Sequence, residues 1–288
     1  MKALYKRELR SYFYSMIGYV FIAALIAFIG YYFMIVNLVS GGPSFVYTLA
    51  YSLSILVIAL PILTMKCFSE ERKNKTDQLL LTSPVSVFSI VMAKYLSLLT
   101  VFAIPLAIFC VCPLLIASFG NNYLLGDYLG IISLFFMGSM LISIGMFVST
   151  LTENQLISAI ISFAVMLVLF MWNSIVSYIP NTSVASLVGL FVVLAALLLI
   201  IYSMTKNKLL TIIVGVAGTA VLVVLYLLNP NMFYSLIPNV LGSFSLTTPF
   251  YNYAMYYIFD LGGIILYISV SALFVFLSMQ MIQKRRWS

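Results

Sequence analysis

Six of the eight residues from position 70 to position 77 are charged, in a chain where only 7% of residues carry charge. The acids among them are Glu70, Glu71 and Asp77, and three leucines, Leu79, Leu80 and Leu81, follow soon after. Paired carboxylates can perform general acid–base chemistry. Here, however, basic side chains lie among the acids, and these neighbours and the position in a loop fit a solvated docking surface better than a catalytic cluster. We therefore interpret this stretch as a solvated contact surface.

The rest of the chain offers little for catalysis, since it has seven acids in all and no histidine. Cys67, Cys110 and Cys112 lie in or beside apolar runs, and without histidine we expect them to pack rather than bind metal. The sequence contains no G-x-x-x-x-G-K-[ST] loop for nucleotide phosphates. We therefore expect this chain to bind no cofactor. A polytopic membrane enzyme is the less favoured alternative.

Composition indicates an integral membrane protein, because 64% of residues are hydrophobic and the mean hydropathy is +1.17. Apolar runs long enough to cross a bilayer as helices recur along the chain, and they are continuous rather than alternating as in a barrel. The predicted fold is all-α, a single polytopic transmembrane domain over 1–288. The first run lacks a small-residue cleavage site and should remain as a span. The runs are 15–38, 45–67, 86–118, 128–150, 155–178, 183–203, 209–228 and 261–283.

The basic residues predict the orientation, because short loops rich in Lys and Arg stay in the cytoplasm. With eight spans, all fourteen basic residues fall on one side, and the opposite loops carry only Asp127 and Asp260 as charges. Both ends would then be cytoplasmic in a multi-pass protein of the cell membrane. We expect the two aspartates to cap helices and stay hydrated. The net charge of +7 reflects topology and requires no nucleic-acid partner.

Residues 1–16 predict an amphipathic helix in the membrane surface. Its apolar face holds Tyr5, Leu9, Tyr12 and Met16, expected among acyl chains, and a basic stripe holds Lys2, Lys6 and Arg10, expected among lipid headgroups. The alternative is a basic flank that only orients the first span. In the long third run, we expect Lys94 to reach the interface and Pro105 and Pro113 to kink the helix.

The loop 69–84 should contain a short helix, since Thr76 is a good N-cap, Asp77 suits a helix N-terminus and Pro84 stops the helix. Two turns of helix are unstable alone in water. The leucines therefore need a partner. The physical alternatives are the chain's own helix ends, lipid headgroups, or a groove on a soluble protein.

Five sequence stretches, in this order and spacing, resemble the permeases of the ABC type 2 exporter family, and most of all its gliding-motility-type branch. They are "KALYKRELRSYFYSMIGY", "EERKNKTDQLLLTSPV", "IVMAKYLSLL", "STLTENQLISA" and "KRRW". The resemblance implies a permease that dimerises with a second or related copy and works with two ATPase subunits, which hold ATP and Mg. Membrane lipids would surround it.

The resemblance also implies site residues. The coupling helix that docks onto the ATPase corresponds to Glu70, Glu71, Arg72, Thr76, Asp77, Leu79, Leu80, Leu81 and Pro84. A second, weaker contact corresponds to Thr152, Glu153 and Asn154, where Glu153 with Thr152 could instead cap a helix.

Two departures from the family pattern stand out. Lys75 and Gln78 occupy positions where relatives carry glycine and an acid. Relatives commonly have six spans, so 183–228 resembles an inserted helical hairpin. We expect 229–260, which is rich in proline and aromatics, to form short broken helices on the outer face.

The function predicted from the sequence is therefore the permease subunit of an ATP-driven exporter. Its spans contain few charges, which favours an unidentified amphipathic substrate over small ions. The alternative is a permease-like membrane anchor or force-coupling scaffold without cargo. Substrate-dependent flux would distinguish the two.

Overall fold

The structure is a computed structural model that describes residues 1–76, 85–120 and 123–287. Every regular element in these residues is a helix, and eight helical segments are long and apolar enough to span a membrane. The all-α fold and the predicted number of spans are therefore confirmed. The segments are Ile17–Val39, Leu53–Lys73, Val87–Ser118, Leu124–Leu151, Gln155–Ser177, Ser183–Thr205, Lys208–Leu228 and Leu261–Arg285.

The chain folds as two compact units. Unit 1 comprises Met1–Phe170 and Leu246–Ser288, and unit 2 comprises Met171–Ser245. The N-terminal half of unit 1 contains, in order, α1 (Lys2–Tyr14), α2 (Ile17–Phe33) with its π-helical extension η1 (Met34–Val39), α3 (Phe45–Tyr51), α4 (Leu53–Thr64) and α5 (Lys66–Lys73). A single residue, Met65, separates α4 from α5, so the second span runs directly into the charged stretch.

The third apolar run is divided beside Pro113, one of the two prolines at which a kink is predicted. It forms α7 (Val87–Phe109), which continues through Pro105, and α8 (Cys112–Ser118), with Pro113 in the first turn of α8. A proline is tolerated there because the first N–H groups of a helix need no intrahelical partner. Unit 1 is completed by α9 (Leu124–Leu151), the first part of α10 (Gln155–Ser177), α14 (Thr248–Tyr256) and α15 (Leu261–Trp287).

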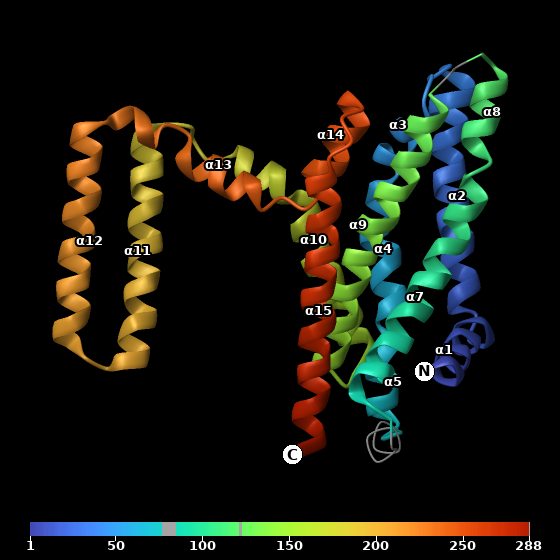
Figure 1. Ribbon diagram of the computed structural model, residues 1–288, viewed down its shortest axis with the longest axis horizontal. Coiled ribbons are helices and arrows are strands. Elements are labelled where there is room, and N and C mark those ends of the chain that lie inside the picture. Colours follow the sequence, from blue (N-terminus) through green and yellow to red (C-terminus); the bar gives the residue numbers. More distant parts are fainter. Residues whose placement is uncertain (77–84, 121–122, 288) are drawn as a thin grey trace. The chain divides into compact units, whose positions relative to one another are not determined.

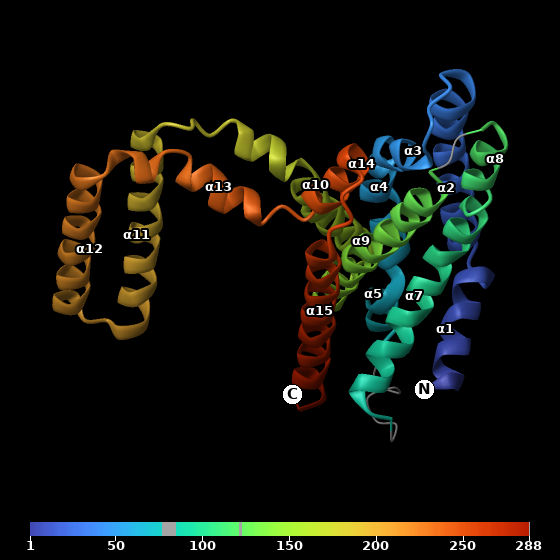
Figure 2. The ribbon, with the colours of Figure 1, turned by 45° about the horizontal axis from the view of Figure 1, so that its top comes forward.

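Helix α9 is the centre of unit 1, and more than three quarters of its span is buried. It contacts α3, α4, α5, α7 and α15, as Figures 1 and 2 show. Close approach depends on glycines, because a Cβ added at Gly138 would overlap the Phe102 ring of α7, and one at Gly145 would overlap the Thr64 hydroxyl of α4. Gly130 faces Val46 of α3 in the same way.

Both termini lie at one end of unit 1, together with α5 (Figure 1). We call this the terminal end, and it includes α1, α5, the start of α7 and the final residues of α9 and α15. The other end, which carries α3, α8 and α14, is called the opposite end.

Unit 2 contains two long helices, α11 (Ser183–Thr205) and α12 (Lys208–Leu228), which lie side by side (Figure 1). They are joined at the predicted turn, where the Asn207 side chain caps α12 by accepting hydrogen bonds from the N–H groups of Leu209 and Leu210. The segment 229–260 forms the expected short helices, namely η2 (Pro230–Phe233), α13 (Leu236–Ser243) and α14. That it lies on the outer face stays a prediction. That 183–228 is an insertion stays a prediction.

Candidate functional site

The structure places the predicted coupling residues only in part. Glu70, Glu71 and Arg72 lie on the last turns of α5, and Thr76 lies three positions after its last residue, Lys73. The remaining coupling residues, Asp77, Leu79, Leu80, Leu81 and Pro84, lie outside the described residues. The short helix expected at 76–82 is therefore untested.

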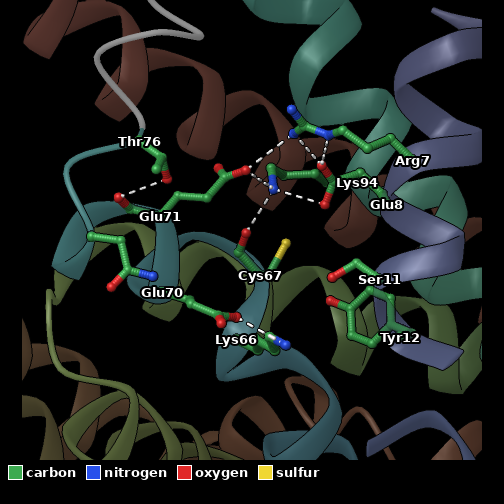
Figure 3. A pocket seen from close by; sticks show the side chains of 11 residues that line it. Arg7, Glu8, Ser11, Tyr12, Lys66, Cys67, Glu70, Glu71, Thr76 and Lys94 are labelled. Atoms are coloured by element: carbon green, nitrogen blue, oxygen red, sulfur yellow. Dashed lines mark hydrogen bonds and ion pairs between the residues drawn. The ribbon is translucent and has the colours of Figure 1, made fainter. Parts of the chain in front are cut away.

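Glu71 belongs to a group of charged side chains from three helices at the terminal end. The Lys94 ammonium of α7 lies 2.9 Å from Glu8 Oε2 of α1 and 3.0 Å from Glu71 Oε1 of α5. It also donates a hydrogen bond of 2.9 Å to the Cys67 carbonyl (Figure 3). The lysine thereby links α1, α5 and α7.

Arg7 completes this group, which we call the charge cluster: Arg7, Glu8, Glu71 and Lys94. Its guanidinium lies 2.5 Å from Glu8 Oε1 and 3.2 Å from Glu71 Oε1. Burial alone would raise the pKa of the Glu8 carboxyl. The charges of Lys94 and Arg7, with their hydrogen bonds, outweigh burial and hold that pKa below its usual value. Two cations thus balance two carboxylates.

The expectation that Lys94 reaches the membrane interface is wrong, because its side chain is only 2% exposed. Isolated burial of an ammonium would be costly, but two carboxylates and a carbonyl oxygen solvate it here. The Phe68 ring, whose centroid is 5.2 Å from Lys94 Nζ, adds a cation–π contact.

The expected placement of the α1 aromatics is also wrong. Tyr12 is buried in the protein core, and the Tyr5 hydroxyl hydrogen-bonds Thr100 Oγ1 of α7 at 2.8 Å. Leu9 packs against the same core. This face of α1 covers α7 instead of facing acyl chains, because α7 offers both apolar and polar partners. Met16 and the basic stripe of Lys2, Lys6 and Arg10 are exposed.

The predicted second contact lies beside α5. Arg72 donates hydrogen bonds to Glu153 Oε1 at 2.8 Å and to the Thr150 carbonyl at 3.2 Å. Asn154, rather than Thr152 or Glu153, caps α10, since its Oδ1 accepts from Leu156 N. The structure therefore joins the two stretches that the sequence assigned separately to docking.

A cavity of about 560 Å³ lies beneath the start of the loop (Figure 3). The charge cluster forms part of its wall. Within the described residues, no three potential metal-ligating side chains gather there or elsewhere. The lining residues are Arg7, Glu8, Ser11, Tyr12, Lys66, Cys67, Glu70, Glu71, Asn74, Thr76 and Lys94.

The sequence analysis did not identify three members of the charge cluster, Arg7, Glu8 and Lys94, as residues of a candidate site. It also missed Ser149 of α9, whose Oγ accepts from the N–H groups of Phe68 and Ser69 and so fixes α5. One signal was available for Lys94, since a charge well inside an apolar run requires a partner.

Asp127, at the opposite end, is a helix cap, although it caps a distant helix. Its Oδ1 accepts hydrogen bonds from the Ser44 hydroxyl at 2.6 Å and from Phe45 N at 2.8 Å, at the start of α3. The side chain is buried, so the expected hydration is wrong: the donors of α3 replace water. Asp260 is exposed and caps α15 through Gly262 N at 2.8 Å.

Comparison with protein families gives one match, to the family described as ABC-2 family transporter protein, over residues 39–229. The match covers more than half of the chain, including α5, α7 and α9. Comparisons with curated proteins and with solved structures found no match. With its eight candidate spans and its all-helical fold, the chain belongs to the ABC-2 family of membrane transporter proteins.

Proposed function

We propose that the chain is the transmembrane permease subunit of an ATP-driven exporter of the gliding-motility-type branch. A separate ATPase subunit binds and hydrolyses ATP with Mg, and this chain binds neither. Two permease copies, or this one and a relative, pair with two ATPase subunits in the cell membrane. Family membership supports the permease role. The one-sided Lys and Arg distribution supports cytoplasmic termini.

The observation that carries the proposal is the connection between the start of the loop and α7. Thr76 N donates to the Glu71 carbonyl at 2.9 Å, so Thr76 is fixed to α5. The carboxylate of the same Glu71 contacts Lys94 of α7. A displacement of the loop at Thr76 would therefore be transmitted to the membrane-spanning helix α7 through Glu71.

Closure of the ATPases would press on the short helix at 76–82, and the movement would enter the membrane along two routes. One is α5 and α4, which are separated by a single residue. The other is α7, which starts just after the loop. Such a displacement of packed helices belongs to the rigid-body class of transitions.

The second contact would widen the docking surface. Glu153 is 72% exposed yet bonded to Arg72, so an ATPase that touches the loop could also touch 152–154. A rim charge of this kind contributes to encounter and specificity more than to affinity.

The spans support an amphipathic substrate. Their buried charges, Lys94 and Asp127, are both neutralised or capped by partners within the protein. Ion pathways usually leave charged groups facing a route through the membrane. An apolar route suits a lipid-like molecule better.

The first prediction tests docking, with Leu79→Asp and Leu80→Asp combined. Each leucine anchor is worth about 1.5–3 kcal/mol, so their loss should weaken ATPase binding at least about a hundredfold. The measurement is co-purification of ATP-hydrolysing activity with the tagged permease from its native membrane. Insertion should be unaffected because neither leucine lies in a span.

The matched control is Asn207→Asp with Lys208→Asp, which adds negative charge at the α11–α12 turn, where the introduced carboxylate can still cap the helix. It should retain the ATPase. If the double-leucine variant retained the ATPase and its normal stimulation, the docking role would be wrong, and the leucines would be packing within the permease.

A further inference from the structure

A second hollow at the terminal end lies between α1 and the start of α5. It is a shallow, open hollow of about 680 Å³. Its lining includes four basic residues and three hydroxyl side chains but no acid, and we call it the basic groove. Its residues are Ala3, Lys6, Arg7, Arg10, Ser11, Tyr14, Ser15 and Lys66.

Two of the four cations in the basic groove are already neutralised. Arg7 pairs with Glu8 and Glu71, and Lys66 pairs with Glu70 at 3.1 Å. Lys6 and Arg10 differ: they lie four residues apart on α1, are exposed, and form no ion pair with the residues that the structure describes. The basic groove therefore carries about two uncompensated positive charges and is complementary to an anion.

The groove also lies next to the ends of two candidate spans. α1 ends three residues before α2, the first span, and Lys66 directly follows α4. Its edge is apolar and exposed, with Tyr14 at 85%, Met16 at 74% and Tyr19 at 59% exposed. The Tyr19 ring stacks edge-on against Phe13, with centroids 5.4 Å apart. Exposed aromatics of this kind gather at the headgroup level of a bilayer.

An occupant must therefore be anionic on one side and apolar on the other. We propose that the basic groove binds the phosphate headgroup of an anionic phospholipid, with the phosphate at Lys6 and Arg10 and the acyl chains beside Tyr14 and Tyr19. Cations at such positions attract anionic lipids. Arg7 lines the basic groove and is also a member of the charge cluster, where it pairs with Glu71 of α5. A lipid bound in the groove would therefore help to hold α1 against α5.

The second prediction concerns Lys6→Gln with Arg10→Gln in the full-length, detergent-solubilised protein. Each cation is worth about 1 kcal/mol toward an anionic lipid, or about fivefold, so the double variant should retain about 25-fold less phosphatidylglycerol. Native mass spectrometry of the protein in micelles with phosphatidylglycerol or phosphatidylcholine measures this retention. Phosphatidylcholine retention should not change.

The matched control is Lys73→Gln with Lys75→Gln, which removes the same charge at the same end from exposed positions outside both the groove and the basic stripe of α1. It should retain phosphatidylglycerol as the unchanged protein does. Lys6→Arg with Arg10→Lys should also retain it. Lys6 and Arg10 are both exposed, so their substitution should not disturb the fold. If the double variant aggregates, Lys6→Gln and Arg10→Gln can be measured singly, and each should retain about fivefold less phosphatidylglycerol.

Two results would overturn the assignment. Equal loss in the groove and control variants, or no loss in either, would mean that the groove is not a specific site. Full displacement of phosphatidylglycerol by millimolar glycerol phosphate or inorganic phosphate would mean that the groove takes free phosphate rather than lipid. Neither readout depends on an ATPase, so the docking experiment and this one can fail separately.

Discussion

The two ends of unit 1 each bury carboxylate groups, but they neutralise them in different ways. At the terminal end, Glu8 and Glu71 meet the cations Lys94 and Arg7, and each cation contacts both acids. At the opposite end, Asp127 meets neutral donors: one hydroxyl and two backbone N–H groups of α3. The terminal end therefore contains a network of ion pairs whose partners can exchange, and the opposite end contains a fixed helix cap.

This difference indicates which end can rearrange. Long Lys, Arg and Glu side chains can change partners without any change in the backbone. The donors of Asp127 belong to the first turn of α3, which Asn37 also holds by donating to the Ser44 carbonyl at 2.9 Å. Moving them would unwind the helix. The adaptable contacts of unit 1 therefore lie at its terminal end.

The third prediction breaks the charge cluster with Lys94→Met, which should have the largest effect. It leaves the buried Glu8 and the partly buried Glu71 without their buried cation, and only the half-exposed Arg7 remains beside them. Breaking a buried pair costs about 3–5 kcal/mol. The midpoint of thermal unfolding in detergent should fall on the order of 10 °C.

The control for this variant combines Lys94→Met with Glu8→Gln and Glu71→Gln, so that no acid of the charge cluster is left without Lys94. Arg7 loses its two acids, but its side chain is 53% exposed and can be hydrated. Stability should largely return, because the cost lies in the orphaned acids. If the triple variant were as unstable as Lys94→Met alone, the lysine would matter through its packing and its bond to the Cys67 carbonyl.

The fourth prediction tests the fixed cap with Asp127→Asn. The amide retains an acceptor oxygen but loses the charge that strengthens its hydrogen bonds, a loss of about 1–2 kcal/mol. The unfolding midpoint should fall by a few degrees. Asp260→Asn, at an exposed cap, should change it far less. Equal effects at both positions would show that burial of the Asp127 cap contributes nothing.

The fifth prediction uses acid to sharpen the comparison and has the smallest expected effect. The pKa of Glu8 is below its usual value in the folded protein, so Glu8 contributes stability above about pH 4.5, and this is lost as pH falls through the folded pKa. Glu8→Gln lacks this contribution. The difference in unfolding midpoint between the two proteins should therefore shrink from about pH 6 to about pH 3. A constant difference would contradict the pairing of Glu8.

The spans were predictable because continuous apolar runs and proline positions are local properties of a sequence. The break between α7 and α8 near Pro113 is an example. The charge cluster was not predictable in the same way, since Glu8 and Lys94 are 86 positions apart and only packing of α1 on α7 brings them together. The position of Lys94 in its own apolar run predicted that its side chain reaches the membrane interface. Its partners on other helices, Glu8 and Glu71, instead hold it inside the protein.

The caps show the same limit at shorter range. Asp260 caps the helix that it precedes, as local reasoning expects. Asp127 lies in the first turn of its own helix, yet it caps α3, more than 80 positions earlier in the chain. A sequence pattern identifies a residue that is able to cap a helix, but the tertiary fold selects the helix.

The glycines of α9 restrict the movements available to unit 1. Gly130, Gly138 and Gly145 face α3, α7 and α4 with no space for a Cβ. If α9 turned about its own axis, larger neighbouring side chains would have to enter these same narrow crossings and would collide with the facing helices. Independent rotation of α9 is thus blocked at three positions along its length, namely Gly130, Gly138 and Gly145. These four helices retain few relative degrees of freedom, so any hinge in unit 1 must lie outside their shared contacts.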